Sequence, residues 1–206
     1  MGLVLFSGPP TEPLALQEVK DHLRVTETAD DGLITTLITA ARQHVDGKDG
    51  WLGRALITQT WDMKIDRFPA WCDSSLDAWR RAVAIRVPLP PLQSVTSVKY
   101  LDTAGAEQTL DPSKYVVHVS EEPGLIAPAF GQTWPTTRDQ LEAVTVRFVA
   151  GYGASADAVP ATLKLGLKAL VAHFYENPEP VISGTISEKL PMHVDALLAP
   201  YRVWSA

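Results

Sequence analysis

The stretch VTVRFVAGYGASADAVPATLKLGLKALVAHFYENPEPV, residues 144–181, holds a strand, a glycine joint and a long helix in direct succession. Val144, Val146 and Phe148 alternate with polar residues, which is the period of a half-buried strand. Gly151 and Gly153 then interrupt the pattern and act as a backbone joint. This part of the chain therefore predicts a change from strand to helix within a few residues.

The helix of this stretch is predicted to begin at Pro160, because a proline in the first turn loses no helical hydrogen bond. It ends at Asn177, since Pro178 disfavours helical geometry in the residue before it. Its apolar residues follow the helical period and form one stripe. They are Leu163, Leu167, Leu170, Val171 and Phe174.

Two further helices are predicted near the N-terminus, over residues 14–25 and 31–46, and the joint between them is short and polar. Asp30 or Asp31 is expected to cap the second helix through its carboxylate. Residues 1–13 read as an extended arm. The apolar positions at helical spacing are Leu16, Val19 and Leu23 in the first helix, and Leu33, Ile34, Leu37, Ile38, Ala41 and Val45 in the second.

The period changes to two between these helices and the third. Residues 56–66 alternate as a long amphipathic strand, and residues 68–81 have no period and are predicted to be a long loop. Asp102 to Gly105 reads as a hairpin turn. Further short strands are expected at 83–87, 95–101, 108–110, 115–119, 125–127 and 144–149.

The fold class that follows is α+β: a helical bundle of about four helices with an inserted antiparallel β-rich module. The expected divisions are an N-terminal arm and helical hairpin (1–50), the β module (51–149), the long helix that completes the bundle (150–180) and a flexible C-terminal segment with a short helix (181–206). Within the last division, residues 181–189 are polar and small, as in a linker.

Composition limits the classes of function. The chain has 206 residues, a net charge of −6 and one cysteine, Cys72, so an intrachain disulfide and a cysteine-based zinc site are excluded. No apolar run approaches the ~20 residues of a membrane helix. Residues 1–50 carry four Lys and Arg against eight Asp and Glu. Such an acidic region does not favour binding to the phosphate backbone of nucleic acids. Two interpretations are open: a DNA-repelling surface or a solvated helix face.

No constellation of residues predicts catalysis. His173 and Glu176 have a helical spacing compatible with metal ligation, but a third ligand at a suitable spacing is missing. Gly151-Tyr152-Gly153 lacks the third glycine of a dinucleotide-binding turn. The acidic pairs Asp30-Asp31 and Glu121-Glu122 point apart as neighbours in sequence and suit caps and turns. The sequence therefore predicts no catalytic residue, no metal site, no cofactor and no enzyme activity.

Six tryptophans leave two interpretations open. Trp61 is predicted to face the core of a strand, whereas the others fall in loops or at ends. Aromatic residues outside regular elements are enriched at protein–protein contacts. They equally serve to cover the edges of a small β module. The five in question are Trp51, Trp71, Trp79, Trp134 and Trp204.

Several short segments of the sequence, taken in order, resemble the head–tail connector (adaptor) proteins of tailed phages, which also occur in gene transfer agents. The resemblance covers most of the chain. It is carried by PLALQEVKDHLRV, ARQHVDG, WLGRALITQTWDMKIDRFP, PLPPLQSVTSVKYLDTAG, the strand–GYG–VP–helix–HFYENPE order and the closing LLAPYRVW.

The resemblance implies a structural subunit of the neck of a virion or phage-like particle, assembled in the bacterial cytoplasm. Its implied partners are the portal protein, a tail-side stopper or tail-completion protein, and copies of itself in a ring, twelve in the family. DNA passes through the channel without specific binding, and no membrane is involved. Free subunits are expected to be monomeric or weakly associated, because each helix has a single apolar stripe and the N-terminal regions repel one another.

Two other functions remain open. The β insert and the loop tryptophans can form a carbohydrate- or protein-binding module, and a hydrolase requires carboxylates or histidines that converge in a pocket. A connector explains the absence of catalytic residues best, so the ranking is connector, binding module, enzyme.

The C-terminal segment, residues 187–204, is the predicted docking element for the portal. A helix of about ten residues is marginal alone in water and folds best against a surface. Packing of this helix on its own bundle is the alternative. The predicted anchors are four apolar residues that share one side of a short helix and one polar residue, Arg202. They are Leu197, Leu198, Tyr201, Arg202 and Trp204.

Overall fold

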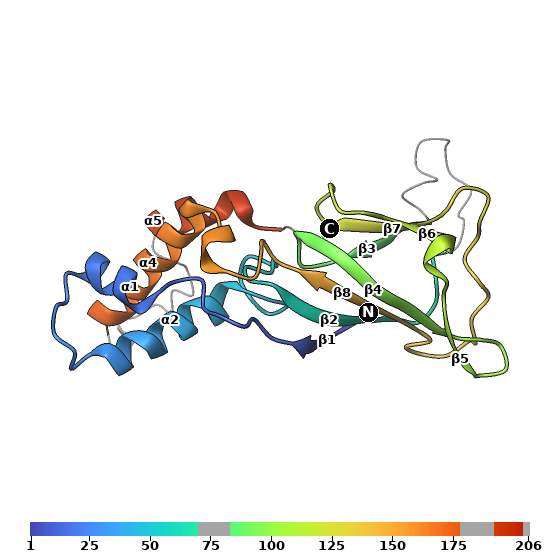
Figure 1. Cartoon of the computed structure of the whole chain (residues 1–206), viewed down its shortest axis with the longest axis horizontal. Helices are drawn as coiled ribbons and strands as arrows, with labels where there is room; N and C mark the ends of the chain where they lie inside the picture. The colour runs from blue at the N-terminus through green and yellow to red at the C-terminus, as the bar shows by residue number, and fades with distance from the viewer. Residues whose placement is uncertain (70–82, 178–191, 204–206) are drawn as a thin grey trace, which may run out of the picture. The chain divides into compact units, whose positions relative to one another are not determined.

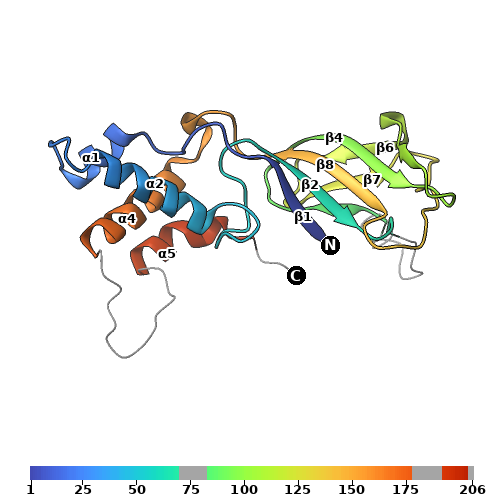
Figure 2. The same cartoon turned by 90° about the horizontal axis from the view of Figure 1, so that it is seen from below.

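The computed structural model describes residues 1–69, 83–177 and 192–203 (Figures 1 and 2). The chain forms two compact units. The β unit comprises residues 1–8 and 58–151, and the helical unit comprises residues 9–57 and 152–206. The chain thus passes from one unit to the other three times.

The helical unit packs α-helices around one apolar core, and Figure 2 shows α4 and α5 side by side. Short 3-10 turns η2 (Ala156–Ala158) and η3 (Ala199–Tyr201) flank them. No described helix is long and apolar enough to cross a bilayer. The α-helices of the described chain are α1 (Leu16–Leu23), α2 (Asp31–Val45), α4 (Ala161–Glu176) and α5 (Met192–Leu198).

The β unit contains two antiparallel sheets. The five-stranded sheet has the order β1-β2-β8-β4-β5, and the three-stranded sheet has the order β3-β7-β6. The first sheet consists of β1 (Gly2–Ser7), β2 (Gln59–Ile65), β8 (Val144–Ala150), β4 (Leu92–Leu101) and β5 (Glu107–Thr109). The second consists of β3 (Ile85–Val87), β7 (Gly124–Pro128) and β6 (Tyr115–His118), which follows the 3-10 turn η1 (Pro112–Lys114).

The central strands β2 and β8 show the alternation that the sequence predicts. Trp61 lies opposite Phe148 and Met63 lies opposite Val146, and all four side chains are buried. The alternate side chains form the other face of the sheet, where Arg147 donates two hydrogen bonds to Asp62, at 2.7 and 2.8 Å. These bonds hold the pKa of Asp62 below its usual value. The core-facing position predicted for Trp61 is confirmed.

The predicted α+β class is confirmed, with the helices and the antiparallel insert near the expected positions. Several boundaries differ by two or three residues, and two of the differences matter for the fold. Residues 2–7 are not a separate arm but an edge strand, because their backbone pairs with β2. β4 begins at Leu92 rather than at Val95, directly after three prolines at 88, 90 and 91. The predicted loop over 68–81 and the linker over 181–189 fall largely or wholly outside the described residues.

The joint between α1 and α2 is held by charged groups in a way that the sequence analysis missed. The sequence predicts that Asp30 or Asp31 caps α2 through its carboxylate, and this prediction is wrong: Asp30 stands at the N-cap position, but no side-chain capping hydrogen bond is made there. Asp31 instead pairs with the buried Lys20 at 2.5 Å, and Asp30 accepts a hydrogen bond from the Tyr175 hydroxyl at 2.6 Å. The two carboxylates therefore connect helices rather than cap one, since tertiary partners were within reach.

The predicted glycine joint coincides with the change of unit. Gly151 has a φ of 123°, a conformation open mainly to glycine. Its N–H donates to Pro91 in the β unit, whereas the N–H of Tyr152 donates to Leu56 in the helical unit. Two successive residues thus end one hydrogen-bonding system and begin the other.

Glu18 connects α1 to α4 through two lysines. Its carboxylate lies 2.9 Å from Lys168 Nζ and 3.1 Å from Lys164 Nζ. Partial burial alone would raise the pKa of Glu18, but the hydrogen bonds from both lysines outweigh it and hold the pKa below the usual value. A carboxyl with a lowered folded-state pKa adds stability above its unfolded pKa, and that stability is lost as the pH falls through the folded value.

Glu18→Gln is therefore expected to lower the free energy of unfolding at pH 7 by about 1 kcal/mol, the scale of a partly exposed ion pair. The difference from the native protein shrinks as the pH falls below 4. Urea unfolding at pH 7 and pH 3.5 measures it, with the exposed Glu27→Gln as the matched control. An effect of Glu18→Gln that persists unchanged at pH 3.5 contradicts the assignment.

Candidate docking segment

The predicted docking segment is described from Met192 to Val203, and most of it lies on the helical unit. Leu198 is fully buried in the core of that unit, as is Val194 one turn earlier. A Cβ added at Gly166 of α4 would stand 2.5 Å from Leu198 Cδ2. Gly166 thus lets α5 approach α4 closely, because any larger side chain would occupy the space of Leu198.

Arg54 ties the end of the segment to the helical unit. It is only 6% exposed, its Nε donates to the Tyr201 carbonyl, and its Nη1 donates to the Tyr152 hydroxyl, both at 2.9 Å. The N–H of Val203 donates in turn to the Leu52 carbonyl at 2.8 Å. A buried guanidinium with good acceptors holds its partners firmly, because leaving any of them unpaired is costly.

A second group of charges lies at the C-terminal end of α2, next to the loop that carries Arg54. Arg42 pairs with Glu12 at 2.7 Å and lies 3.6 Å from the Asp46 carboxylate. Asp46 is buried and accepts a hydrogen bond from the N–H of Leu56 at 3.0 Å. The loop that carries Arg54 is therefore fixed at Asp46 and at Leu56, one on each side of it.

The predicted anchors are accordingly divided. Leu198 faces inward, so the alternative interpretation, in which this helix packs on its own bundle, describes its position. Leu197 and Tyr201 are half-buried, and the half-buried Arg202 places its guanidinium 4.5 Å from the centre of the Trp51 ring. Trp204 lies outside the described residues. The portal-binding role of these residues stays a prediction.

Gly166 and Arg54 are functional positions that the sequence pattern does not predict, although each is unusual where it stands. Gly166 interrupts the apolar run of a long helix, where glycine costs roughly 1 kcal/mol relative to alanine and so indicates a close contact. Arg54 is a single charge within the apolar run Trp51 to Ile57. Neither feature of the sequence indicates the partner, because the contacting residues lie in other elements: Leu198 for Gly166, and Tyr152 and Tyr201 for Arg54.

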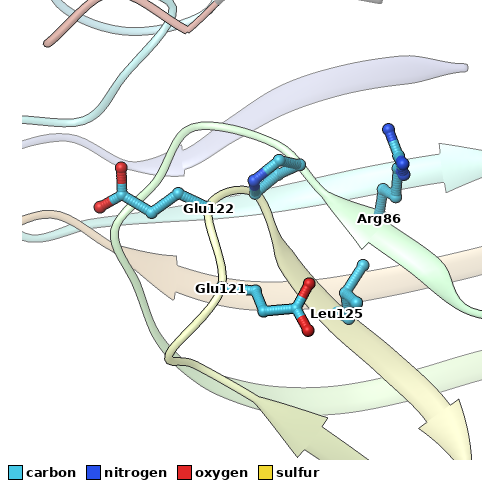
Figure 3. Close-up of a pocket in the computed structure, with 5 residues that line it drawn as sticks. Arg86, Glu121, Glu122 and Leu125 are labelled. Carbon is cyan, nitrogen blue, oxygen red and sulfur yellow. The ribbon is translucent and has the colours of Figure 1, made fainter. Parts of the chain in front are cut away.

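A shallow pocket in the β unit carries the acidic pair Glu121-Glu122 (Figure 3). Arg86, Pro123 and Leu125 also line it, and its volume is about 150 Å³. Figure 3 shows the two carboxylates pointing in different directions. The glutamates and Arg86 are exposed, so the pocket lacks the buried, converging groups of a catalytic site. Within the described residues, no three His, Cys, Asp or Glu side chains gather as metal ligands.

The described loop tryptophans are engaged within the protein. Trp134 stacks on Phe68 with ring centres 4.7 Å apart, and its indole N–H donates to the Val83 carbonyl. Trp51 packs against the helical core beneath Arg202. Trp134 belongs to the β unit and Trp51 to the helical unit. The contacts of Trp134 favour the edge-covering interpretation, whereas Trp51 covers the helical core and not the β module.

Comparison with known proteins agrees with the fold. Residues 14–64, which include α1, α2 and nearly all of β2, match the family model of the Phage gp6-like head-tail connector protein. The whole chain is similar to a chain from the neck of an empty gene transfer agent (GTA) particle computed with C6 symmetry. That likeness has a TM-score of 0.75 and 24% identity, and covers 100% of this chain and 97% of that one.

Two further structures match over the same shares of both chains. A chain from the virion of a native GTA particle has a TM-score of 0.74 and 24% identity. A chain from the neck of a native GTA particle computed with C12 symmetry has a TM-score of 0.69 and 22% identity. No curated protein matches significantly.

The chain therefore has the fold of a protein found in the neck of GTA particles. Its residues 14–64 match the model of the Phage gp6-like head-tail connector protein family. The resemblance inferred from the sequence is confirmed by both findings.

Arg54→Met is expected to lower the free energy of unfolding by about 2–3 kcal/mol, because it leaves the Tyr201 carbonyl and the Tyr152 hydroxyl without their charged donor. The matched control is Arg202→Met, which removes a surface contact with an aromatic ring and costs less than about 1 kcal/mol. Guanidinium unfolding monitored by circular dichroism measures both. Equal losses for the two variants contradict the role of Arg54.

Proposed function

We propose that the protein is a structural head–tail connector, or adaptor, subunit of a phage or phage-like particle. It forms a ring of copies, twelve by family analogy, beneath the portal and joins the portal to the tail. The observation that carries the proposal is the connector match over residues 14–64 within a fold similar over its whole length to GTA neck chains. The absence of a converging catalytic group in the described residues supports a structural role rather than an enzymatic one.

The partners proposed are the portal protein on one side and a stopper or tail-completion protein on the other. DNA passes through the channel of the ring without specific binding, and no membrane is involved. The acidic balance of residues 1–50 supports passage, since a surface rich in carboxylates does not hold phosphates. The protein acts in the neck of the particle after assembly in the bacterial cytoplasm.

The C-terminal segment is the proposed portal contact, with one anchor fewer than the sequence predicts. Leu198 holds α5 on the helical unit, so it serves as an internal support. Leu197, Tyr201, Arg202 and Trp204 remain the proposed anchors. A docked rather than a free segment suits recognition, because a segment already ordered loses less conformational entropy when it binds.

The double variant Arg202→Glu/Trp204→Ala is expected to weaken binding to the portal ring of the same particle by about tenfold or more, a loss of at least ~1.4 kcal/mol, since Trp and Arg dominate interface energies. Surface plasmon resonance on immobilised portal rings measures it, and circular dichroism checks the fold. The matched control is Leu165→Asp, an exposed position on α4. Native binding by the double variant refutes this contact, and no binding by the native chain refutes the connector role.

Free subunits are expected to be monomeric or weakly associated at micromolar concentration, with rings forming on the portal. The reason is the single apolar stripe of each helix, which the helical unit largely buries in its own core. Size-exclusion chromatography with light scattering measures the mass with and without portal. A stable large ring of the isolated protein contradicts the expectation.

A further inference from the structure

The edge strand β1 is open and uncharged. Among the described residues β1 has one strand neighbour, β2, so the other side of its backbone faces outward. Its sequence GLVLFS contains no charge, and Val4, Leu5 and Phe6 are 51%, 48% and 59% exposed. Edge strands are normally protected by charged side chains, prolines or a covering element. β1 itself carries neither a charge nor a proline, and the Arg147 guanidinium lies over the Phe6 ring, 3.6 Å from its centre. Such an apolar edge indicates a strand-pairing surface.

The same sheet has a second open stretch on its opposite side. β5 pairs only with Lys99 to Leu101 of β4, and Leu110 adds one bond to the Val98 carbonyl. Within the described chain, residues 92–97 of β4 have no strand on that side. Their sequence LQSVTS is also uncharged, with Gln93, Ser94 and Thr96 exposed.

The directions of the two open stretches are complementary. Each strand of the sheet is antiparallel to its neighbours, so β1 and β8 run one way and β2 and β4 run the other. If a second copy of the sheet continues the first in the same orientation, its β1 meets β4 as an antiparallel neighbour. Antiparallel pairing is the more stable arrangement.

The register also agrees. Val4 lies opposite Asp62, Asp62 lies opposite Arg147, and Arg147 lies opposite Ser97, so Val4 and Ser97 are the two ends of one cross-strand row. The row that begins at Leu5 ends in the same way at Val95. A copy placed beside the first without a shift along the strands brings Ser97 next to Val4 and Val95 next to Leu5.

We propose that β1 of one copy of this protein pairs with residues 92–97 of β4 in the next copy, and that this head-to-tail contact joins neighbours in the ring. The inference rests on the proposed ring function. A contact between two different surfaces is the kind that a cyclic ring repeats around its axis. A second copy is the occupant argued for because both edges of one sheet match each other in direction, row and lack of charge.

The contact is weak on its own. A two-stranded pairing is marginal in water, so it forms when subunits are concentrated or held side by side on a template. This agrees with a free subunit that is monomeric at low concentration. The uncharged edges then serve assembly at little cost to solubility, since the net charge of −6 lies elsewhere on the chain.

Cross-linking of the full chain tests the proposal. Val4→Cys and Ser97→Cys are made separately in a Cys72→Ser background, mixed at high concentration and oxidised mildly. A disulfide requires Cβ atoms about 4 Å apart, so it reports adjacency of the two positions. The expected result is a disulfide-linked heterodimer in the mixture. The matched control mixture is Leu165→Cys with Ser97→Cys, in which this product is lost.

Two other results overturn the proposal. If Val4→Cys alone forms its homodimer as readily as the mixture forms the heterodimer, β1 pairs with β1 in a two-fold contact. If the mixture yields no more product than the control, the edges do not pair with each other, and β1 is left to a different protein or to none. Folding of each variant is checked by circular dichroism before oxidation.

The outcome is distinguishable from that of the proposed function. A chain that binds portal rings but does not cross-link remains a connector with a different subunit contact. A chain that cross-links through these positions but ignores the portal keeps the edge contact and loses the connector role.

Discussion

The buried guanidinium of Arg54 is the constraint on which the helical unit depends most. It is fixed between the Tyr201 carbonyl and the Tyr152 hydroxyl, so one side chain connects the loop after α2, the glycine joint and the C-terminal segment. These three parts are far apart in sequence. A buried charge tolerates few other positions, because each hydrogen bond that it loses leaves an unpaired group out of reach of water. The position of the C-terminal segment therefore follows from that of Arg54.

This constraint changes how the C-terminal end can act on a partner. A free amphipathic helix would bind by folding against the partner and would lose conformational entropy in doing so. A segment that Leu198 and Arg54 already hold presents its remaining groups in a fixed arrangement. The proposed portal contact then rests on the half-buried residues at the surface of the segment rather than on its whole apolar stripe. The close contact at Gly166 also helps to fix the segment, since it sets how closely α5 packs on α4.

The β unit is fixed at its centre but open at its edges. Its centre is strongly determined, with Trp61, Met63, Val146 and Phe148 buried inside and the Asp62–Arg147 pair outside. Its two open edges carry no charge that would prevent pairing. A protein that must stay separate until it reaches a template can use such edges, because one short strand pair adds little stability by itself. The open edges are thus consistent with the proposed role of the protein as a connector subunit that assembles into a ring.

The sequence alone determined the elements and their class. Periods of 3.6 and 2 report which side of a helix or strand is apolar, and they located α1, α2, α4 and the strands 59–65 and 144–150. A period does not report what covers the apolar side. Only the tertiary structure decided that residues 2–7 join the sheet, that Asp30 and Asp31 connect helices instead of capping one, and that Leu198 faces inward over Gly166. Each of these depends on a partner in another element, which the local pattern cannot specify.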